Sequence, residues 1–252
     1  MRRLALALVF LTRLPVRLPG QASAAELGAS TASFPAVGAL IGLVTAAVFA
    51  LGLALGLPGL AAAVMALIVQ VMFTGALHED GLGDVADAFG GGWDVEAKLR
   101  ILKDSRQGTY GVLAIVGAFV ARASALSVLP AEVALLVLPV VHATSRAAMV
   151  LLLAMAPAAR QDGLAAALVG VNVRRPALLG VVFAAALAVG VSGRFGLAAL
   201  GLSLVSAGLM GALARRQIGG VTGDVLGAAQ QLGEVSGLLA ASALITEIGW
   251  GA

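Results

Sequence analysis

Long apolar runs separated by short polar segments make up most of the chain. An apolar helix of about 20 residues is long enough to cross the hydrocarbon core of a bilayer. The distribution of these runs predicts seven spans. They are expected at residues 34–57, 59–77, 108–129, 131–155, 177–192, 195–213 and 225–248. We therefore predict an all-α fold, a polytopic transmembrane helical bundle of about seven spans.

The first 18 residues do not follow this pattern, because basic residues interrupt the apolar ones. At a helical rotation of about 100° per residue, four arginines fall within an arc of about 100°. They are Arg2, Arg3, Arg13 and Arg17. This arrangement predicts an N-terminal amphipathic interfacial helix, which Pro15 should end or bend. A secretory signal peptide is the less favoured alternative.

Composition strengthens the membrane interpretation. Hydrophobic residues make up 60% of the 252 residues, charged residues 12%, and the mean hydropathy is +1.03. These values lie outside the range of soluble domains, so we expect one integral membrane domain covering residues 1–252. The absence of cysteine excludes disulfides, thiolate metal sites and cysteine nucleophiles. Scattered basic residues and a single Tyr argue against nucleic acid as a partner.

The distribution of Lys and Arg predicts how the bundle is oriented. With seven spans, the amino terminus and the loops at 75–107, 156–176 and 214–224 lie on the same side. Thirteen of the sixteen Lys and Arg residues fall on that side. Short loops rich in Lys and Arg stay in the cytoplasm. We therefore expect a multi-pass protein of the cytoplasmic (inner) membrane, with these loops facing the cytoplasm.

Acidic residues concentrate between the second and third predicted spans. Residues 74–111 hold seven of the thirteen acidic residues. On a helix that begins at Asp80, the side chains of Asp84 and Asp87 share its face, whereas Glu79 points elsewhere. Carboxylates on one face repel each other, and hard divalent cations with oxygen ligands are their natural partners. A solvated acidic loop is the alternative.

Small residues fill most of the positions between these carboxylates. They are Gly81, Gly83, Ala86 and Ala88. Small side chains would let a bulky anionic ligand come close to the acidic face, and we predict that this is their purpose.

Two further polar segments could bind phosphate on the same side of the membrane. Lys103 and Arg106 bracket Asp104 and Ser105, and their charges could neutralise phosphate oxygens. Anchoring of the next span by positive charge is the alternative.

The second segment, GGVTGD at residues 219–224, places Thr222, Gly223 and Asp224 at a helix start. Free backbone amides at a helix start bind anions, although an ordinary helix cap is equally compatible with this sequence.

Two arginines fall inside predicted spans. Arg122 and Arg146 would cost several kcal/mol if they faced lipid, so they should face the interior and pair with an acid or an anionic ligand. Packing or snorkelling is the alternative. His142, one turn before Arg146, is expected to be a hydrogen-bonded interior histidine. His78 could be a general base, a metal ligand or a helix cap, and the sequence leaves these three roles open.

Carboxylates on one face, nearby cations and glycine-rich helix starts together indicate metal-assisted phosphoryl transfer. The sequence contains no Walker A loop, no HExxH pair and no GxSxG elbow. A transferase that uses a preformed diphosphate is therefore favoured over an ATPase or a serine hydrolase.

Five ordered motifs resemble those of the cobalamin synthase family, the adenosylcobinamide-GDP ribazoletransferases. They are FLTRLPV at 10–16, SFPAVGALIG at 33–42, LHEDGLGDVADAFGG at 77–91, KDSRQGTYG at 103–111 and GGVTGD at 219–224. The resemblance covers essentially the whole chain. It implies that the phosphocobinamide moiety of adenosylcobinamide-GDP is transferred to the 5′-hydroxyl of α-ribazole, or to α-ribazole 5′-phosphate. GMP is released, and Mg²⁺ assists this step of cobalamin biosynthesis.

The residues singled out above fit that reaction, and we expect particular roles for them. The expected Mg²⁺ ligands are Asp80, Asp84 and Asp87, with Asp104 and Asp224 as further ligands or their partners. Residues expected to bind substrate are Arg13, Lys103, Ser105, Arg106, Arg146, Thr222 and Gly223. The proton of the attacking hydroxyl is expected to pass to an aspartate such as Asp84 or to His78.

Two other functions remain as alternatives. CDP-alcohol phosphotransferases share an acidic helix that starts with Asp-Gly, as at Asp80 and Gly81, but the Ala-Arg pair of their pattern is absent here. An ion-coupled transporter is less favoured because the acids lie at the edge of a span instead of its middle. The small-molecule substrates and the bilayer are the expected partners, and a homo-oligomer is left open.

Overall fold

The computed structural model describes residues 2–18, 20–168 and 171–247, and within these ranges the fold is helical without β-strands. The elements are α1 (Arg2–Leu11), α2 (Ala24–Ser30), the 3₁₀ helix η1 (Thr31–Ser33), α3 (Phe34–Ala54), α4 (Gly59–Thr74), α5 (Leu77–Gly91), α6 (Val95–Ile101), α7 (Thr109–Ser127), α8 (Ala131–Met155), α9 (Gly163–Ala167), α10 (Arg174–Ile218) and α11 (Gly223–Glu247). The all-α prediction is confirmed. The predicted end of the last span, at residue 248, lies outside the described residues.

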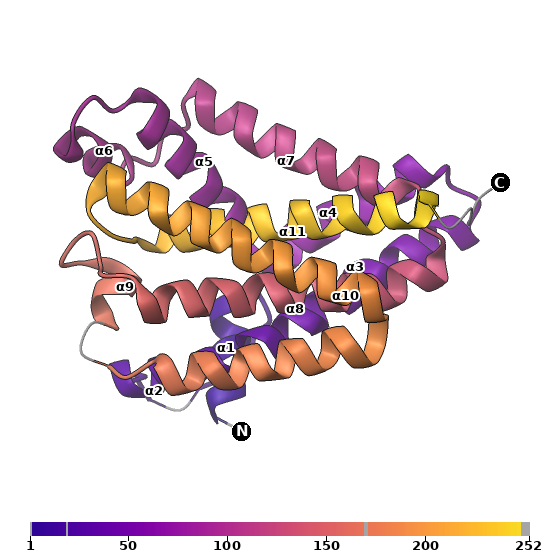
Figure 1. Cartoon of the computed structure of the whole chain (residues 1–252), viewed down its shortest axis with the longest axis horizontal. Helices are drawn as coiled ribbons and strands as arrows, with labels where there is room; N and C mark the ends of the chain where they lie inside the picture. The colour runs from indigo at the N-terminus through magenta and orange to yellow at the C-terminus, as the bar shows by residue number, and fades with distance from the viewer. Residues whose placement is uncertain (1, 19, 169–170, 248–252) are drawn as a thin grey trace.

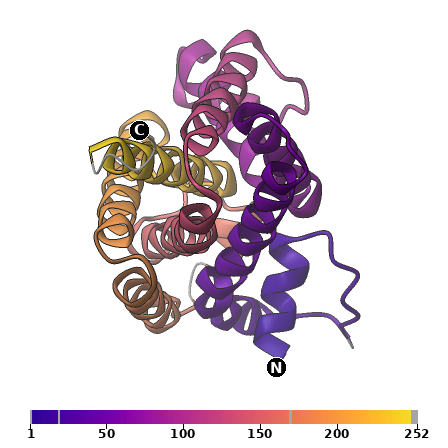
Figure 2. The same cartoon turned by 90° about the vertical axis from the view of Figure 1, so that its right-hand side faces the viewer.

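The long helices form a single bundle around α8, which packs against α3, α10 and α11 (Figures 1 and 2). Every residue of α8 from 140 to 150 is buried. Small residues on α3 make this close packing possible, because a Cβ on Gly38 would lie 2.4 Å from the carbonyl oxygen of His142. A Cβ on Gly42 would lie equally close to the oxygen of Leu138, at 2.4 Å. Membrane helices commonly approach through small residues in this way.

The predicted number of seven spans is not confirmed. Among the described residues, four helical segments are long and apolar enough to cross a membrane. The number rises to five if α4 and α5, which are bent by 92° relative to each other, are counted as one broken span. The four are residues 24–54, α7, α8 and α10.

The fifth and sixth predicted spans both lie in α10, which has 45 residues. Gly193 interrupts this element with non-helical angles, φ 51° and ψ −119°, and the chain turns back there (Figure 1). The two arms come close beyond the turn, because a Cβ on Gly196 would lie 2.3 Å from the carbonyl oxygen of Ala188. The seventh predicted span corresponds to α11. This helix contains several polar residues and is not among the four segments that are apolar enough to cross a membrane.

Helix α1 is shorter than the sequence predicts. It ends at Leu11, before Pro15, so Arg13 and Arg17 lie beyond it and the expectation of four arginines on one helix is wrong. The apolar side of α1 packs on the bundle, and the rings of Phe10 and Phe34 stack with centroids 5.5 Å apart.

A sharp bend between α4 and α5 creates the polar end of the molecule. Gly75 and Ala76 both have positive φ, 71° and 59°. Ala76 is not a glycine, so this conformation is held against a cost of about 1 kcal/mol or more. The bend turns α5 away from the direction of α4, and we place α5 outside the membrane-spanning segments.

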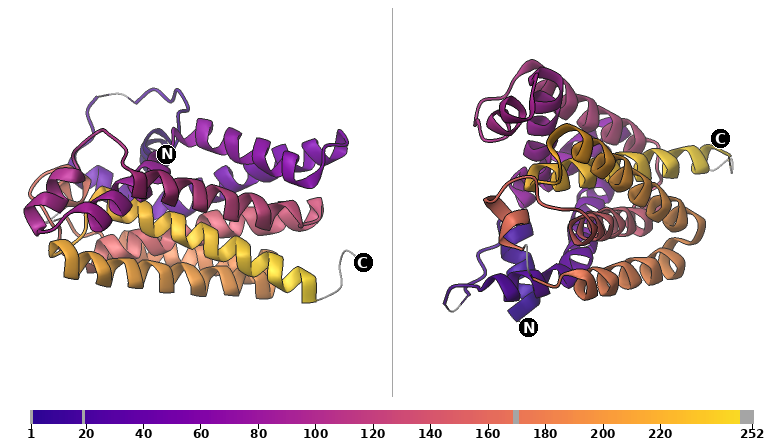
Figure 3. Two further views of the ribbon diagram at one scale, coloured as in Figure 1. Left: turned by 90° about the horizontal axis from the view of Figure 1, so that it is seen from above. Right: turned by 60° about the vertical axis from the view of Figure 1, so that its left-hand side comes forward.

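Helices α5, α6 and α9 and the start of α11 gather at this same end (Figures 1 and 3). The polar loops that the sequence assigned to one side of the membrane are thus together in the fold.

Candidate active site

The carboxylates of Asp80 and Asp84 lie on a shared face of α5, as the helical spacing predicts. One side chain reaches both: Nε2 of Gln107 donates to Oδ1 of Asp84 at 3.1 Å and approaches Oδ1 of Asp80 at 3.5 Å. Burial is the main reason that the pKa of Asp84 is raised from 3.8 to about 6, and the charges of Asp80 and Asp224 add to it. The carboxylate of Asp84 thus lies partly out of water and beside two other acids, an environment that favours its neutral form unless a cation is bound.

Asp87 has a different environment from its two neighbours on α5. It is buried, and its carboxylate accepts hydrogen bonds from the backbone N–H of Gly108 at 2.6 Å and of Gly111 at 2.9 Å. These amides begin α7, where backbone N–H groups lack partners within the helix. Asp87 therefore caps α7 and fixes it to α5. Side chains at the two glycines would collide with the carboxylate, since a Cβ on Gly111 would lie 2.3 Å from Oδ2.

The start of α11 packs directly against α5. Thr222 caps α11, because its Oγ1 accepts from the backbone N–H of Val225 at 3.3 Å and donates to Oδ2 of Asp224 at 3.1 Å. A Cβ on Gly81 would lie 2.9 Å from the carbonyl oxygen of Asp224. A Cβ on Gly83 would lie 2.7 Å from the side-chain oxygen of Gln107. These two glycines thus make room for the protein's own α11 and Gln107.

The cations near the acidic face are paired with other residues. Lys103 Nζ lies 2.6 Å from Asp162, which belongs to the loop before α9. Arg106 holds both oxygens of Asp104 in a two-pronged contact, the shorter at 2.6 Å, and is largely exposed. Ser105 lies exposed between them. Asp104 is therefore neutralised locally, and the hydrogen bonds from the side chain and backbone of Arg106 lower the pKa of its carboxyl group to about 2.

Arg160, which the sequence did not single out, connects two of these groups. Its Nε lies 3.3 Å from Asp162, and its Nη2 lies 3.7 Å from Oδ2 of Asp224. Because Asp162 also pairs with Lys103, one chain of charges links the loop after α6, the loop before α9 and the start of α11. Arg13 lies elsewhere, with its guanidinium over Gly75 at the bend between α4 and α5.

The two intramembrane arginines face the interior, as predicted, and their partners are acids of the protein. Arg146 lies 2.7 Å from Oε1 of Glu234, and Arg122 lies 3.0 Å from its Oε2. Arg122 also lies 3.3 Å from Glu79, and His142 Nδ1 lies 2.7 Å from Glu234. All five side chains are buried. The sequence analysis missed Glu234, although an acid inside an apolar run was the signal that could have found it.

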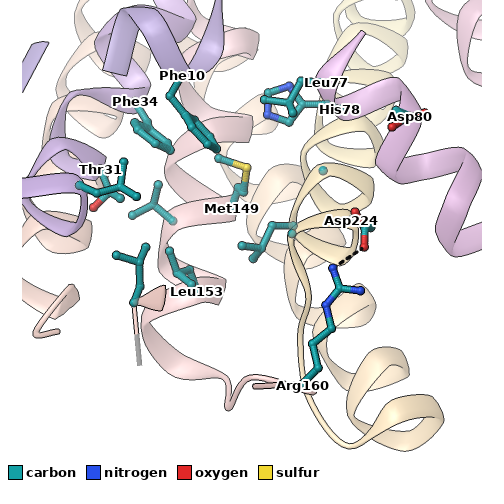
Figure 4. A pocket seen from close by; sticks show the side chains of 16 residues that line it. Phe10, Thr31, Phe34, Leu77, His78, Asp80, Met149, Leu153, Arg160 and Asp224 are labelled. Atoms are coloured by element: carbon teal, nitrogen blue, oxygen red, sulfur yellow. Dashed lines mark ion pairs between the residues drawn. The ribbon is translucent and has the colours of Figure 1, made fainter. Parts of the chain in front are cut away.

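A cavity of about 270 Å³ opens beside this polar end, and its two halves differ in character (Figure 4). The apolar half includes Phe10, Phe34, Met149 and Leu153. The polar half includes His78, Asp80, Arg160, Gly223 and Asp224. The expected site residues His78, Asp80, Gly223 and Asp224 thus converge on one cavity, whereas Arg13, Lys103, Ser105 and Arg146 do not line it.

His78 lies at the wall of this cavity and is almost completely buried. Burial is the main reason that its pKa is lowered from 6.5 to about 3, and the positive charge of Arg146 adds to the effect. The imidazole is therefore neutral at physiological pH, and it is a weak base.

The donor set at the polar end suits a magnesium ion held partly by substrate. Among the described residues, no group of three or more His, Asp or Glu side chains is arranged to hold a metal by itself. Mg²⁺ usually binds through one or two carboxylates, substrate phosphates and water. Asp80 and Asp84, which share one amide donor and retain net charge, fit that coordination, whereas both oxygens of Asp87 accept backbone hydrogen bonds.

Sequence comparisons find relatives over nearly the whole chain. Residues 3–242 match the family described as cobalamin-5-phosphate synthase. A relative from Bradyrhizobium diazoefficiens, named adenosylcobinamide-GDP ribazoletransferase, is 42% identical over 95% of this chain and 93% of its own. A relative of the same name from Mesorhizobium japonicum is 42% identical, covering 96% and 93%. One from Shewanella halifaxensis is 38% identical, covering 92% and 91%. No solved structure matches the chain.

Proposed function

Since the chain belongs to the cobalamin-5-phosphate synthase family, we propose that it is an adenosylcobinamide-GDP ribazoletransferase of the cytoplasmic membrane. Its active site is the polar end of the bundle, where α5, the loop before α7 and the start of α11 meet. In the proposed orientation this end faces the cytoplasm, because the short loops rich in Lys and Arg lie there.

The proposed reaction is a phosphoryl transfer in which one bond forms and one breaks. A ribose hydroxyl of the acceptor attacks the phosphorus on the cobinamide side of the diphosphate. The bond between this phosphorus and the bridging oxygen breaks, and GMP leaves with that oxygen. A 5′-phosphorylated acceptor has no free 5′-hydroxyl, so a mechanism common to α-ribazole and its 5′-phosphate uses a hydroxyl of the ribose ring. A ring hydroxyl therefore takes the place of the 5′-hydroxyl that the resemblance suggested.

The observation that carries the proposal is the pair of carboxylates on α5. Asp80 and Asp84 lie on one face and are bridged by a single amide. Burial, with a further contribution from the charges of Asp80 and Asp224, raises the pKa of Asp84 to about 6. We propose that they hold Mg²⁺, which when bound would neutralise the diphosphate and stabilise the charge on the leaving GMP. Asp224, from the start of α11, adds negative charge to the same place.

The remaining residues position this pair. Asp87 fixes the start of α7, and thereby Gln107, against α5. The candidate proton acceptors are the aspartates and His78. With a pKa of about 3, His78 is too weak a base to accept the proton efficiently at neutral pH. We therefore assign proton acceptance to the aspartates and treat His78 as a neutral wall of the cavity.

The test is turnover by the purified protein in lipid nanodiscs, with adenosylcobinamide-GDP, α-ribazole and Mg²⁺ supplied. We expect release of GMP and formation of adenosylcobalamin. The variant Asp84→Asn should lose at least about 100-fold in rate, because it removes one charge from the metal pair. Asp94→Asn is the matched control, since Asp94 caps α6 at the same end of the molecule and Asn caps equally well.

Three outcomes would contradict the proposal. Near wild-type turnover by Asp84→Asn would remove the metal assignment. Transfer from CDP-activated lipids, with no GMP released from adenosylcobinamide-GDP, would favour a CDP-alcohol phosphotransferase. Accumulation of unchanged substrate inside vesicles would favour a transporter.

A further inference from the structure

The cavity beside the α5 carboxylates is lined by parts of the chain that are far apart in sequence, among them α1, α3, α5, α8 and the start of α11 (Figure 4). Resting on the proposed function, we infer that this cavity binds the acceptor nucleoside, with its aromatic base in the apolar half and its ribose in the polar half.

The apolar half suits a flat aromatic ring. Phe10 of α1 and Phe34 of α3 stack with ring centroids 5.5 Å apart and an interplanar angle of 13°. Met149 and Leu153 of α8 lie opposite them in Figure 4. Aromatic rings and the flexible thioether of methionine both make favourable contacts with an aromatic ligand. The base of α-ribazole, a dimethylbenzimidazole, is such a ligand, because it is aromatic and almost entirely apolar.

The polar half supplies partners for a sugar. Asp80 and Asp224 offer carboxylate oxygens as acceptors, and both line the cavity. Arg160 offers donors, because its buried Nη1 has no hydrogen-bond partner among the described residues. A buried donor without a partner costs free energy that a ligand oxygen would recover. Ribose hydroxyls match all three side chains, and a phosphate on the acceptor matches Arg160.

The volume of the cavity admits the acceptor but excludes the donor. A cavity of about 270 Å³ lies just below the usual range of small-molecule pockets, which is roughly 300–1,000 Å³. It can take a nucleoside, but the corrin ring and side chains of the donor are far too large for it. The donor must therefore lie outside, over the exposed face of α5. Asp80 lies at the boundary, since it lines the cavity and is also exposed. The attacking hydroxyl and the diphosphate would meet there.

The test fills the apolar half and measures each substrate separately in the full-length protein. We expect Met149→Trp and Leu153→Phe to raise the KM for α-ribazole by about tenfold or more, because a pocket discriminates by at least that factor when its volume changes by a few atoms. The KM for adenosylcobinamide-GDP should stay within about twofold, since the donor does not enter the cavity. Leu136→Trp is the matched control, because Leu136 is an exposed residue of α8 outside this cavity.

A second measurement tests the position of the base. Leu153→Phe should shift selectivity toward the riboside of unsubstituted benzimidazole, which is smaller by two methyl groups, by about tenfold in the ratio of kcat/KM values. A merely structural effect would lower kcat/KM for both ribosides by the same factor.

The inference is overturned if the filling variants raise the KM for the donor instead, or leave the KM for α-ribazole unchanged. It is also overturned if mass spectrometry finds a lipid acyl chain in the wild-type cavity that Met149→Trp expels without affecting acceptor binding. Failure of the proposed function is a separate result, because the wild-type protein itself would then release no GMP.

Discussion

Two groups of acidic residues meet near the start of α5, and they differ in how the protein neutralises their negative charge. Glu79 points inward and lies 3.3 Å from Arg122, which also holds Glu234. Asp80, the next residue, is exposed and shares a single amide donor with Asp84. The buried acids are neutralised by arginines of the protein, whereas exposed Asp80 and half-buried Asp84, the exposed pair below, are left with repulsion between them.

This difference indicates which group is structural and which is functional. A buried charge is tolerated when it has a partner of opposite charge. Removing that partner leaves an uncompensated charge inside the protein, which destabilises the fold. Carboxylates left with excess charge at a cavity mouth have no such structural explanation, and a cation with its anionic ligand is what would complete them. Substitutions in the two groups should therefore have different effects, on stability in the buried group and on metal binding in the exposed pair.

The largest effect is expected from removing the centre of the buried group. Glu234→Ala leaves Arg122 and Arg146 without their shared acid, and it also removes the acceptor for His142. We expect the free energy of unfolding to fall by about 3–5 kcal/mol. Thermal unfolding in detergent, followed by circular dichroism, measures this loss.

The matched control for that variant is Glu132→Ala, because Glu132 is an exposed acid in the first turn of α8. Its effect should stay within about 0.5 kcal/mol. If Glu234→Ala were no more destabilising than Glu132→Ala, the buried group would not be the structural centre of the bundle.

The sequence predicted the helical elements well, since apolar runs and helical periodicity are local properties. It placed α3, α7 and α8 close to their observed bounds, and it separated the two arms of α10 near Gly193. It was wrong about α1, where residues beyond Leu11 leave the helix. The helical spacing of the arginines does not show where the helix ends, so residues beyond its end were counted on its face.

The candidate site was predicted only in part, because its geometry depends on contacts between distant segments. The spacing of Asp80, Asp84 and Asp87 gave their common face, but the capping of α7 by Asp87 requires the backbone of Gly108 and Gly111 to be nearby. The bend that brings these segments together depends on positive φ at a non-glycine residue, which no local pattern signals. The role of Arg160 was missed because its contact with Asp224 also joins segments that are distant in sequence.

A medium effect is expected from Asp87, which links the two groups of acids by fixing α7 to α5. Asp87→Ala removes the acceptor for two backbone amides at the start of α7. Loss of a helix cap costs about 0.5–2 kcal/mol, and we expect a loss near the upper end because both amides are affected. Asp87→Asn keeps an acceptor oxygen and should lose less. Equal stability of the Ala variant and wild type would show that Asp87 is free to bind metal.

The smallest effect is expected in the pH dependence of the exposed pair. The pKa of Asp84 is about 6 in the folded protein, above the ordinary 3.8, so the folded state binds its proton more tightly than the unfolded state. Ionised Asp84 therefore destabilises the metal-free fold at neutral pH. This penalty begins to shrink as the pH falls through about 6, and it is absent below 3.8.

In a chelator, Asp84→Asn should therefore unfold at a higher temperature than wild type at pH 7.5, and the gap should close toward pH 4. Solvent screening keeps the gap small, because Asp84 is only partly buried. Added Mg²⁺ should reverse the order at pH 7.5 by stabilising wild type alone. The buried acids should show no such reversal, since Glu234→Gln removes the charge that Arg122 and Arg146 share at every pH. A variant of Asp84 that is less stable than wild type in the chelator would mean that this carboxylate, like the buried ones, is held by the protein itself.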